Sequence, residues 1–256
     1  MESTRGKITT LPSRRNSGTP LRRRILVVAV AAILGTACVQ GRMIAETRDG
    51  NKIMSETEMN SGVTLTGKAN VVDKTLTVEY TVNNSLSNSI YVFDEMIKYD
   101  ASGLPMLDKT NAYVFWEEPS TLRLVRAVLR VPPNMNVYAL EIPFAREVKT
   151  QSSISGKIVL SLPVHEYSPF APTITEENVE TVKCNSIVLF IGWTVMEAGT
   201  TVTETDAGGE QALRVRGGFR PFTLKASFPV ETTLVKFKEG FDRQLPQHWE
   251  KSAAGR

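Results

Sequence analysis

The clearest pattern in the chain is a strict alternation of apolar and polar residues over TLTVEYTV, residues 75–82. Thr or Glu fills every second position, and the positions between them are apolar or aromatic: Leu76, Val78, Tyr80 and Val82. Successive side chains of a β-strand point to opposite faces, so this alternation predicts a strand with one buried face.

Further strands are predicted along the chain, separated by prolines, glycines and other turn residues. They cover residues 63–66, 90–93, 111–116, 137–142, 154–162, 186–196, 224–228 and 233–237. No helical segments alternate with these strands, so the pattern predicts an all-β, antiparallel sandwich or barrel rather than an α/β fold. Residues 197–218, rich in Thr and Gly, are predicted to form a long exposed hairpin or loop.

One segment, STLRLVRAVLRVPP at 120–133, fits two periods. Its arginines, Arg123, Arg126 and Arg130, fall at helical spacing, with apolar residues on the opposite face. Its β-branched residues and the surrounding strands indicate a strand instead. We predict a strand over 121–131 and keep the amphipathic helix as the alternative.

The N-terminal segment has a positively charged part followed by an apolar part. Seven Lys and Arg residues precede residue 25, opposed only by Glu2, and the apolar run ILVVAVAAILGTACV covers residues 25–39. This is the pattern of a secretory signal peptide. The run is shorter than the roughly 20 residues that a transmembrane helix needs. We predict a cleaved signal peptide over 1–37, with its n-region at 1–24 and its h-region at 25–37; an uncleaved anchor is the alternative.

The residues around Cys38 determine what remains after cleavage. The run LGTAC, 34–38, resembles the lipobox of bacterial lipoproteins, although Gly35 stands where Leu, Val or Ile is usual. The resemblance implies that Cys38 is acylated and becomes the new N-terminus. Gly35 and Ala37 also satisfy the small-x-small rule of an ordinary signal peptidase, which would release a soluble, secreted product. Residues 22–26, RRRIL, are similar to a twin-arginine signal, which implies export of a folded domain.

The second cysteine, Cys184, has two readings that depend on Cys38. If Cys38 is lipidated, Cys184 has no partner in the chain and is expected to be a small buried apolar residue. If Cys38 is retained unmodified, a disulfide between residues 38 and 184 becomes possible in an oxidising compartment.

Removing the leader changes the charge balance. The whole chain has a formal net charge of +3, but residues 39–256 carry 23 Lys and Arg against 26 Asp and Glu, a net of −3. No excess positive charge is left to bind nucleic acid.

We divide the chain into the signal peptide, a tether at 38–61, a β-sandwich domain at 62–238 and a polar tail at 239–256. The sequence TLTVEYTVNNSLSNSIYVFDE, 75–95, resembles adjacent strands of immunoglobulin-like domains in bacterial exported proteins, which implies an immunoglobulin-like sandwich.

Two groups of residues are candidates for partner binding. Arg123, Arg126 and Arg130 form a possible anion or partner patch, because guanidinium groups on one face bind carboxylates or phosphates bidentately. A solvated basic face is the alternative, and a strand would place Arg123 opposite the other two. The loop after 160 is a possible partner loop, since loops on rigid scaffolds often carry recognition. Its candidate residues, whose alternative role is to cap the core, are His165, Glu166, Tyr167 and Phe170.

Motifs for catalysis are lacking. His165-Glu166 begins like a zinc-protease motif, but Pro169 stands where the second His is needed. No G-x-S-x-G turn, metal-ligand spacing or cofactor motif occurs, so we predict no catalytic residue, metal or cofactor. The acidic pairs Asp94-Glu95 and Glu117-Glu118 are the basis of an alternative, a hydrolase with paired carboxylates, although each pair on a regular strand offers only one group inward.

Two functional hypotheses therefore remain. The first is a non-enzymatic binding or structural module of the cell envelope, periplasmic and anchored to the membrane through a lipid on Cys38, with an envelope protein or a glycan as partner. The second is an envelope hydrolase that uses carboxylates such as Asp94 or Glu117.

Overall fold

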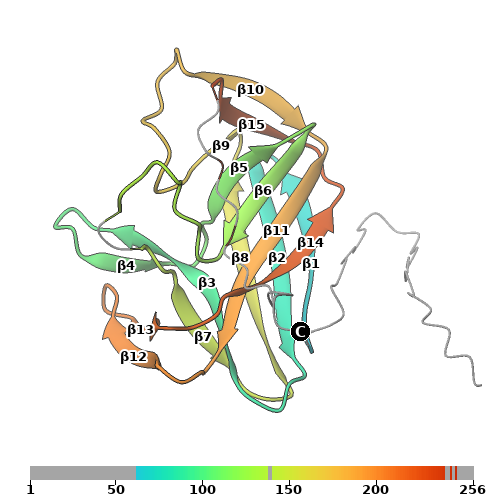
Figure 1. The fold of residues 1–256 in the computed structure, drawn as a ribbon. Helices are drawn as coiled ribbons and strands as arrows, with labels where there is room; N and C mark the ends of the chain where they lie inside the picture. The colour runs from blue at the N-terminus through green and yellow to red at the C-terminus, as the bar shows by residue number, and fades with distance from the viewer. Residues whose placement is uncertain (1–61, 138–139, 240–242, 244–245, 247–256) are drawn as a thin grey trace, which may run out of the picture. The chain divides into compact units, whose positions relative to one another are not determined.

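The computed structural model describes residues 62–137, 140–239, 243 and 246, and their regular structure consists entirely of β-strands (Figure 1). The strands in chain order are β1 (Val63–Val72), β2 (Thr75–Asn84), β3 (Ile90–Tyr99), β4 (Pro105–Asp108), β5 (Tyr113–Glu117), β6 (Thr121–Arg126), β7 (Phe144–Val148), β8 (Ser152–Ser161), β9 (Val164–His165), β10 (Val179–Cys184), β11 (Ser186–Val195), β12 (Thr200–Asp206), β13 (Gln211–Gly217), β14 (Phe222–Phe228) and β15 (Thr232–Phe237). The prediction of an all-β, antiparallel sandwich is confirmed.

One layer of the sandwich is an antiparallel sheet in the order β1-β2-β8. Its central strand is the one that the alternating pattern predicts, and the inward residues Leu76, Val78, Tyr80 and Val82 are each at most 2% exposed. The polar positions between them face outward and are half-buried. The prediction for this strand is therefore confirmed residue by residue.

The facing layer is a larger sheet built around β11. One edge of β11 pairs with β14, and the other pairs with β6 and then, farther along, with β3. The core between the layers is formed by side chains of β1, β2 and β8 against those of β3, β6, β11 and β14. Figure 1 shows the two layers crossing face to face. Burial of this apolar surface is the main stabilising term of such a fold.

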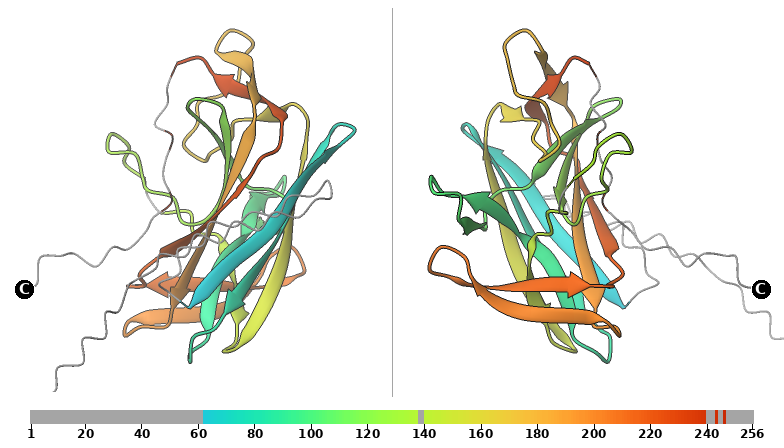
Figure 2. Two further views of the ribbon diagram at one scale, coloured as in Figure 1. Left: turned by 90° about the vertical axis from the view of Figure 1, so that its right-hand side faces the viewer. Right: turned by 60° about the vertical axis from the view of Figure 1, so that its left-hand side comes forward.

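Two smaller units extend this framework. β10, β15 and β9 form a three-stranded sheet at one end. The segment 197–218, predicted as a hairpin or loop, is a hairpin of β12 and β13, and it joins the large sheet where Leu213 pairs with Ala145 of β7. In Figure 2 this hairpin runs across the lower end of the molecule.

The ambiguous segment after Ser120 forms a strand, so the helical alternative is wrong. β6 runs parallel to β11 over Thr121–Arg126, and the regular strand ends there, before the predicted end at 131. Leu122 and Leu124 pack in the main core, and Val125 on the opposite face packs in a second apolar cluster. Both faces of β6 are therefore buried, which explains why its sequence lacks a clean alternation.

The strand predicted at 137–142 is an error. The described residues of this range lie outside any strand, and β7 begins at Phe144, directly after Pro143. Proline has no N–H to donate to a sheet ladder, so it marks the start of the strand instead of following one. The sequence does not predict β4, β7, β9 and β10, because their short sequences lack a sustained alternation.

The predictions for the leader, Cys38 and the tether, and most of those for the tail, concern residues outside the described part of the chain. Within that part, no helix is long and apolar enough to cross a membrane. The resemblance to immunoglobulin-like domains stays a prediction.

Candidate functional site

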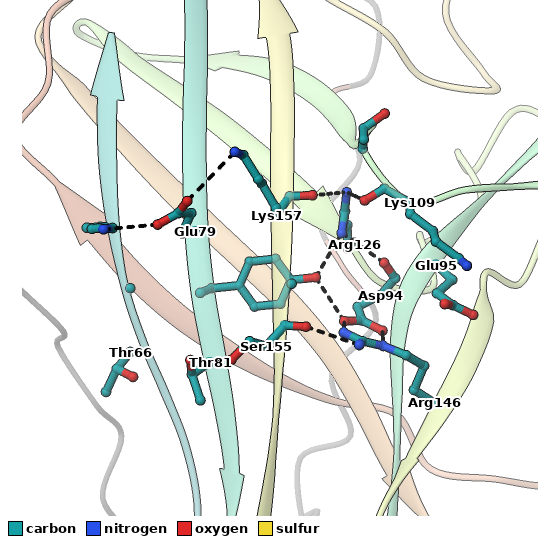
Figure 3. Close-up of a pocket in the computed structure, with 15 residues that line it drawn as sticks. Thr66, Glu79, Thr81, Asp94, Glu95, Lys109, Arg126, Arg146, Ser155 and Lys157 are labelled. Carbon is teal, nitrogen blue, oxygen red and sulfur yellow. Dashed lines mark hydrogen bonds and ion pairs between the residues drawn. The ribbon is translucent and has the colours of Figure 1, made fainter. Parts of the chain in front are cut away.

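A pocket of about 710 Å³ lies where the β1-β2-β8 sheet meets β3 and the ends of β6 and β7 (Figure 3). Hydroxyl and charged side chains line much of it. The charged lining residues are Lys68, Glu79, Asp94, Glu95, Lys109, Arg126, Arg146 and Lys157. Pockets of this size are typical of small-ligand sites, so this pocket is the candidate functional site.

Three of the lining residues form a row across the β1-β2-β8 sheet. Strand register places Gly67, Tyr80 and Gly156 opposite one another. A Cβ atom at 156 would lie 2.8 Å from Tyr80 Cε2 and closer still to the end of the phenol. Glycine at 156 therefore lets the Tyr80 side chain lean over β8 and reach the facing layer.

Tyr80 and Arg146 hold the buried carboxylate of Asp94. The Tyr80 hydroxyl donates to Asp94 Oδ2 at 2.8 Å, Arg146 Nε donates to Oδ1 at 2.9 Å, and Arg146 Nη2 pairs with Oδ2. Asp94 is 1% exposed, so these donors replace its water. Burial raises the pKa of Tyr80 far above its usual value, and the neighbouring Asp94 carboxylate raises it further.

Arg126 is buried beside this pair, at 1% exposure. A guanidinium has five N–H donors, and all five are used within the protein. The acceptors are Asn111 O at 2.7 Å, Tyr80 Oη at 2.8 Å, Asp94 O at 3.0 Å, Lys109 O at 2.8 Å and Lys157 O at 3.0 Å. Arg126 thus has no donor left for a ligand, and its role is to fix the floor of the pocket.

These arginines also close an open strand edge. β8 lies at the edge of its sheet, where backbone groups would otherwise lack partners. Ser155 O accepts from Arg146 Nη1 at 3.1 Å, Lys157 O accepts from Arg126, and Val159 N donates to Thr110 O at 2.9 Å. Side chains and a loop replace a neighbouring strand, which leaves room for the pocket.

A β-bulge in β3 brings both acidic residues of the pair to the pocket. Val92 pairs with Arg146 and Glu95 pairs with Phe144, so β3 advances three residues where β7 advances two. The extra residue changes the direction of the side chains that follow it. Asp94 and Glu95 consequently both line the pocket. The expectation that this pair offers only one group inward is wrong for this reason.

Glu95 is the lining residue with unused hydrogen-bonding capacity. Its carboxylate makes no hydrogen bond or ion pair with any residue that the structure describes, although the side chain is half-buried. Burial raises the pKa of Glu95, Asp94 raises it further, and the cations of Arg146 and Lys109 partly oppose this. A carboxylate in this position offers acceptors to a bound molecule.

The remaining charged groups lie at the rim and are already engaged. Lys109 pairs with Glu210, Lys68 Nζ lies 3.0 Å from a Glu79 oxygen, and Lys157 Nζ lies 3.8 Å from the other. These pairs are exposed to solvent and exchange readily. They add donors near the carboxylate without giving the pocket a strong excess of either charge.

The structure does not bring the three arginines of the predicted patch onto one exposed face. Arg123 is 4% exposed, lies 4.9 Å from the centre of the Phe115 ring and donates to Arg243 O. Arg126 is buried on the other face of β6, and only Arg130, beyond the end of the strand, is exposed.

The predicted partner loop is divided between surface and interior. His165 and Tyr167 are exposed, whereas Phe170 packs against a small apolar cluster. Glu166 is 1% exposed and accepts from Trp116 N, Phe237 N and the Arg243 guanidinium. This carboxylate therefore anchors the loop and the start of the tail, and it does not face a partner.

Cys184 is buried in the main core, and burial raises the pKa of its thiol to about 11. Both facts agree with the expectation that Cys184 is a small buried apolar residue. Within the described ranges, no group of three or more His, Cys, Asp or Glu residues is placed to hold a metal ion.

Comparisons with protein-family models, with curated proteins and with solved structures give no match for this chain.

Proposed function

We propose that the protein is an exported, non-enzymatic β-sandwich binding module of the cell envelope, anchored to the membrane through a lipid on Cys38, and that its pocket binds a hydroxyl-rich ligand such as a segment of a glycan. The observation that carries the proposal is the position of Glu95. This carboxylate is half-buried in a pocket wall and has no hydrogen-bond or ion-pair partner among the residues that the structure describes. Burial and Asp94 both oppose its ionisation, so the residue costs stability in the free protein.

Residues that cost stability are often kept because a binding or catalytic function needs them. Sugar hydroxyl groups donate hydrogen bonds to a carboxylate and accept them from lysine and hydroxyl side chains. The pocket offers both kinds of partner, with Glu95 as acceptor and with Lys109, Thr110 and Lys157 elsewhere in its lining. We therefore favour a neutral glycan over a protein among the two partner classes.

The floor of the pocket favours binding over chemistry. Asp94 accepts hydrogen bonds from Tyr80 and Arg146, and all the donors of Arg126 are used. Groups held in this way orient the walls but do not reach a substrate to transfer a proton. Pre-organised walls also reduce the entropy lost when a ligand binds.

The envelope location follows from the charged leader, its apolar run and the lipobox-like residues before Cys38. A lipid on Cys38, followed by a polar tether of about twenty residues, would hold the domain near a membrane surface.

A titration with soluble neutral oligosaccharides, of the cello-, chito- and malto- series, tests the proposal. We expect one series to shift the backbone NMR signals of Thr66–Lys68 and Ser155–Lys157, without being cleaved. Glu95→Gln should weaken that binding at least tenfold, and Glu204→Gln, at an exposed position of β12, should leave it unchanged. Equal binding by both variants, or shifts located elsewhere, would contradict the proposal.

The hydrolase is a second candidate, and the bulge in β3 favours it. Asp94 and Glu95 both line the pocket, and burial raises the pKa of Glu95, as the acid of a glycosidase requires; Asp94 would have to be released from Tyr80 and Arg146 to act as the second carboxylate. The same titration decides between the candidates: release of new reducing ends by the wild type but not by Glu95→Gln would establish the enzyme.

A further inference from the structure

A second groove, of about 390 Å³, lies away from the pocket on the side of the β12–β13 hairpin. It is bounded by β13, the end of β3 and the chain just before β7, and Figure 2 shows this hairpin beside the projecting β3–β4 hairpin. The residues that matter are Tyr99, Leu140, Glu141, Ile142, Arg214 and Arg216.

Arg214 has unused donors in this groove. Its guanidinium lies 5.0 Å from the centre of the Phe144 ring, and its Nε is buried without a hydrogen-bond partner. No carboxylate of the described residues forms an ion pair with Arg214. A buried N–H without an acceptor destabilises the folded protein, so such a group calls for an explanation.

Glu141, the acidic residue of the groove, accepts a hydrogen bond from a buried tyrosine. Tyr113 Oη, from a side chain that is 1% exposed, donates to Glu141 Oε1 at 2.7 Å. Arg216 is exposed two residues after Arg214 on the same face of β13, and it forms no ion pair with a described residue. The two guanidinium groups therefore stand next to one another, and neither pairs with a carboxylate in the described part of the chain.

We propose that this groove binds an oxyanion, either a carboxylate or a phosphate, carried by a small ligand with an apolar or aromatic part. Guanidinium groups bind such anions through paired, charge-assisted hydrogen bonds. Arg214 and Arg216 supply the donors. The exposed ring of Tyr99, at 59% exposure, and the side chains of Leu140 and Ile142 provide an apolar ledge beside them. The inference is independent of the glycan-binding pocket, with which the groove shares no residue.

The test uses the full mature protein and three small aromatic probes: N-acetylphenylalanine, its uncharged amide, and phenyl phosphate. NMR signals of arginine Nε–H groups report the contact directly. We expect the carboxylate or the phosphate probe to shift the Arg214 Nε–H signal to saturation, and the amide to leave it unchanged. The stronger of the two anions identifies the source of the oxyanion.

Arg214→Gln should weaken binding of the preferred anion at least tenfold, and Arg216→Gln about threefold. The control is Arg130→Gln, which removes an exposed arginine outside both cavities and should change nothing. Arg216 is exposed, so its variant stays informative even if Arg214→Gln fails to fold. The proposal is overturned if the amide binds as well as the acid, or if neither groove variant weakens binding.

Discussion

Arg126 shows how single residues build the pocket floor. Its charge is buried, yet it forms no salt bridge among the described residues; four backbone carbonyls and the Tyr80 hydroxyl surround it. Dipoles thus replace water around the cation. Each member of this network depends on the others, because loss of one partner leaves a buried polar group unsatisfied.

Replacement of Tyr80 by Phe tests this dependence. It removes the donor to Asp94 and an acceptor of Arg126 while keeping the ring. We expect a loss of about 1–3 kcal/mol in the free energy of unfolding, measured by urea denaturation. Tyr91→Phe, at a half-buried tyrosine of β3 outside the network, serves as the control and should change stability little. Equal stability of the two variants would show that the network contributes nothing.

Gly156→Ala tests the close approach of Tyr80 to β8. The new methyl group would overlap the phenol and displace its hydroxyl from Asp94 and Arg126. Overpacking of this kind costs about 1–3 kcal/mol, which a denaturation curve resolves. Gly218→Ala is the matched control, because no atom lies within 4 Å of its added carbon. A neutral result at 156 would mean that Tyr80 does not lie over β8.

Cys184 tests the burial of the core at residue scale. Since burial raises the pKa of its thiol to about 11, the native protein should contain almost no thiolate at pH 8. In a Cys38→Ala variant, where Cys184 is the single thiol, we expect alkylation by iodoacetamide to be slow until denaturant is added. Rapid labelling of the native protein would contradict the buried position.

At the scale of elements, the sequence predicts the strands that alternate and misses those that do not. The buried face of β2 can be read from the chain, because one of its sides faces the core and the other faces outward. The strand β6 cannot be read in this way, since Leu122 and Leu124 on one face and Val125 on the other are all buried in apolar clusters. The apolar residues before Pro143 suggest a strand at 137–142, but the strand β7 begins only after that proline, at Phe144.

Only part of the candidate site can be predicted from the sequence, because the rest depends on pairing between distant strands. The alternation predicts that Tyr80 points inward, where its hydroxyl group lies among aliphatic side chains and needs a hydrogen-bond partner. The bulge that turns Glu95 toward the pocket depends on pairing with β7, fifty residues away, and no local pattern announces it. The arginine spacing that suggested a surface patch instead reflects two buried residues on opposite faces of a strand.

At the scale of the whole molecule, the proposal requires export and a lipid anchor. The intact mass of the mature protein from membrane and soluble fractions tests both. We expect an N-terminus at Cys38 with added acyl mass in the membrane fraction, and loss of that mass in Cys38→Ala. An unmodified soluble product with an N-terminus near residue 38 would instead indicate cleavage by an ordinary signal peptidase.

Glu95 offers a direct test of the proposal that the pocket is kept for binding at a cost to stability. Its pKa in the folded protein is raised above the usual value of 4.5, so protonation favours folding. The protonated carboxyl of Glu95 therefore adds to the free energy of unfolding. This contribution is fully present below the pKa of Glu95 in the unfolded chain, and it is lost as the pH rises through the pKa of Glu95 in the folded protein. Glu95→Gln removes this loss.

The measurement is the thermal unfolding of the wild type and Glu95→Gln from pH 3 to pH 7, with Glu204→Gln as control. We predict that Glu95→Gln is the more stable protein at pH 7, that its advantage disappears toward pH 3, and that the control follows the wild type throughout. A Glu95→Gln variant that is less stable than the wild type at pH 7 would mean that the carboxylate stabilises the fold, and would contradict the claim that it is retained for a ligand.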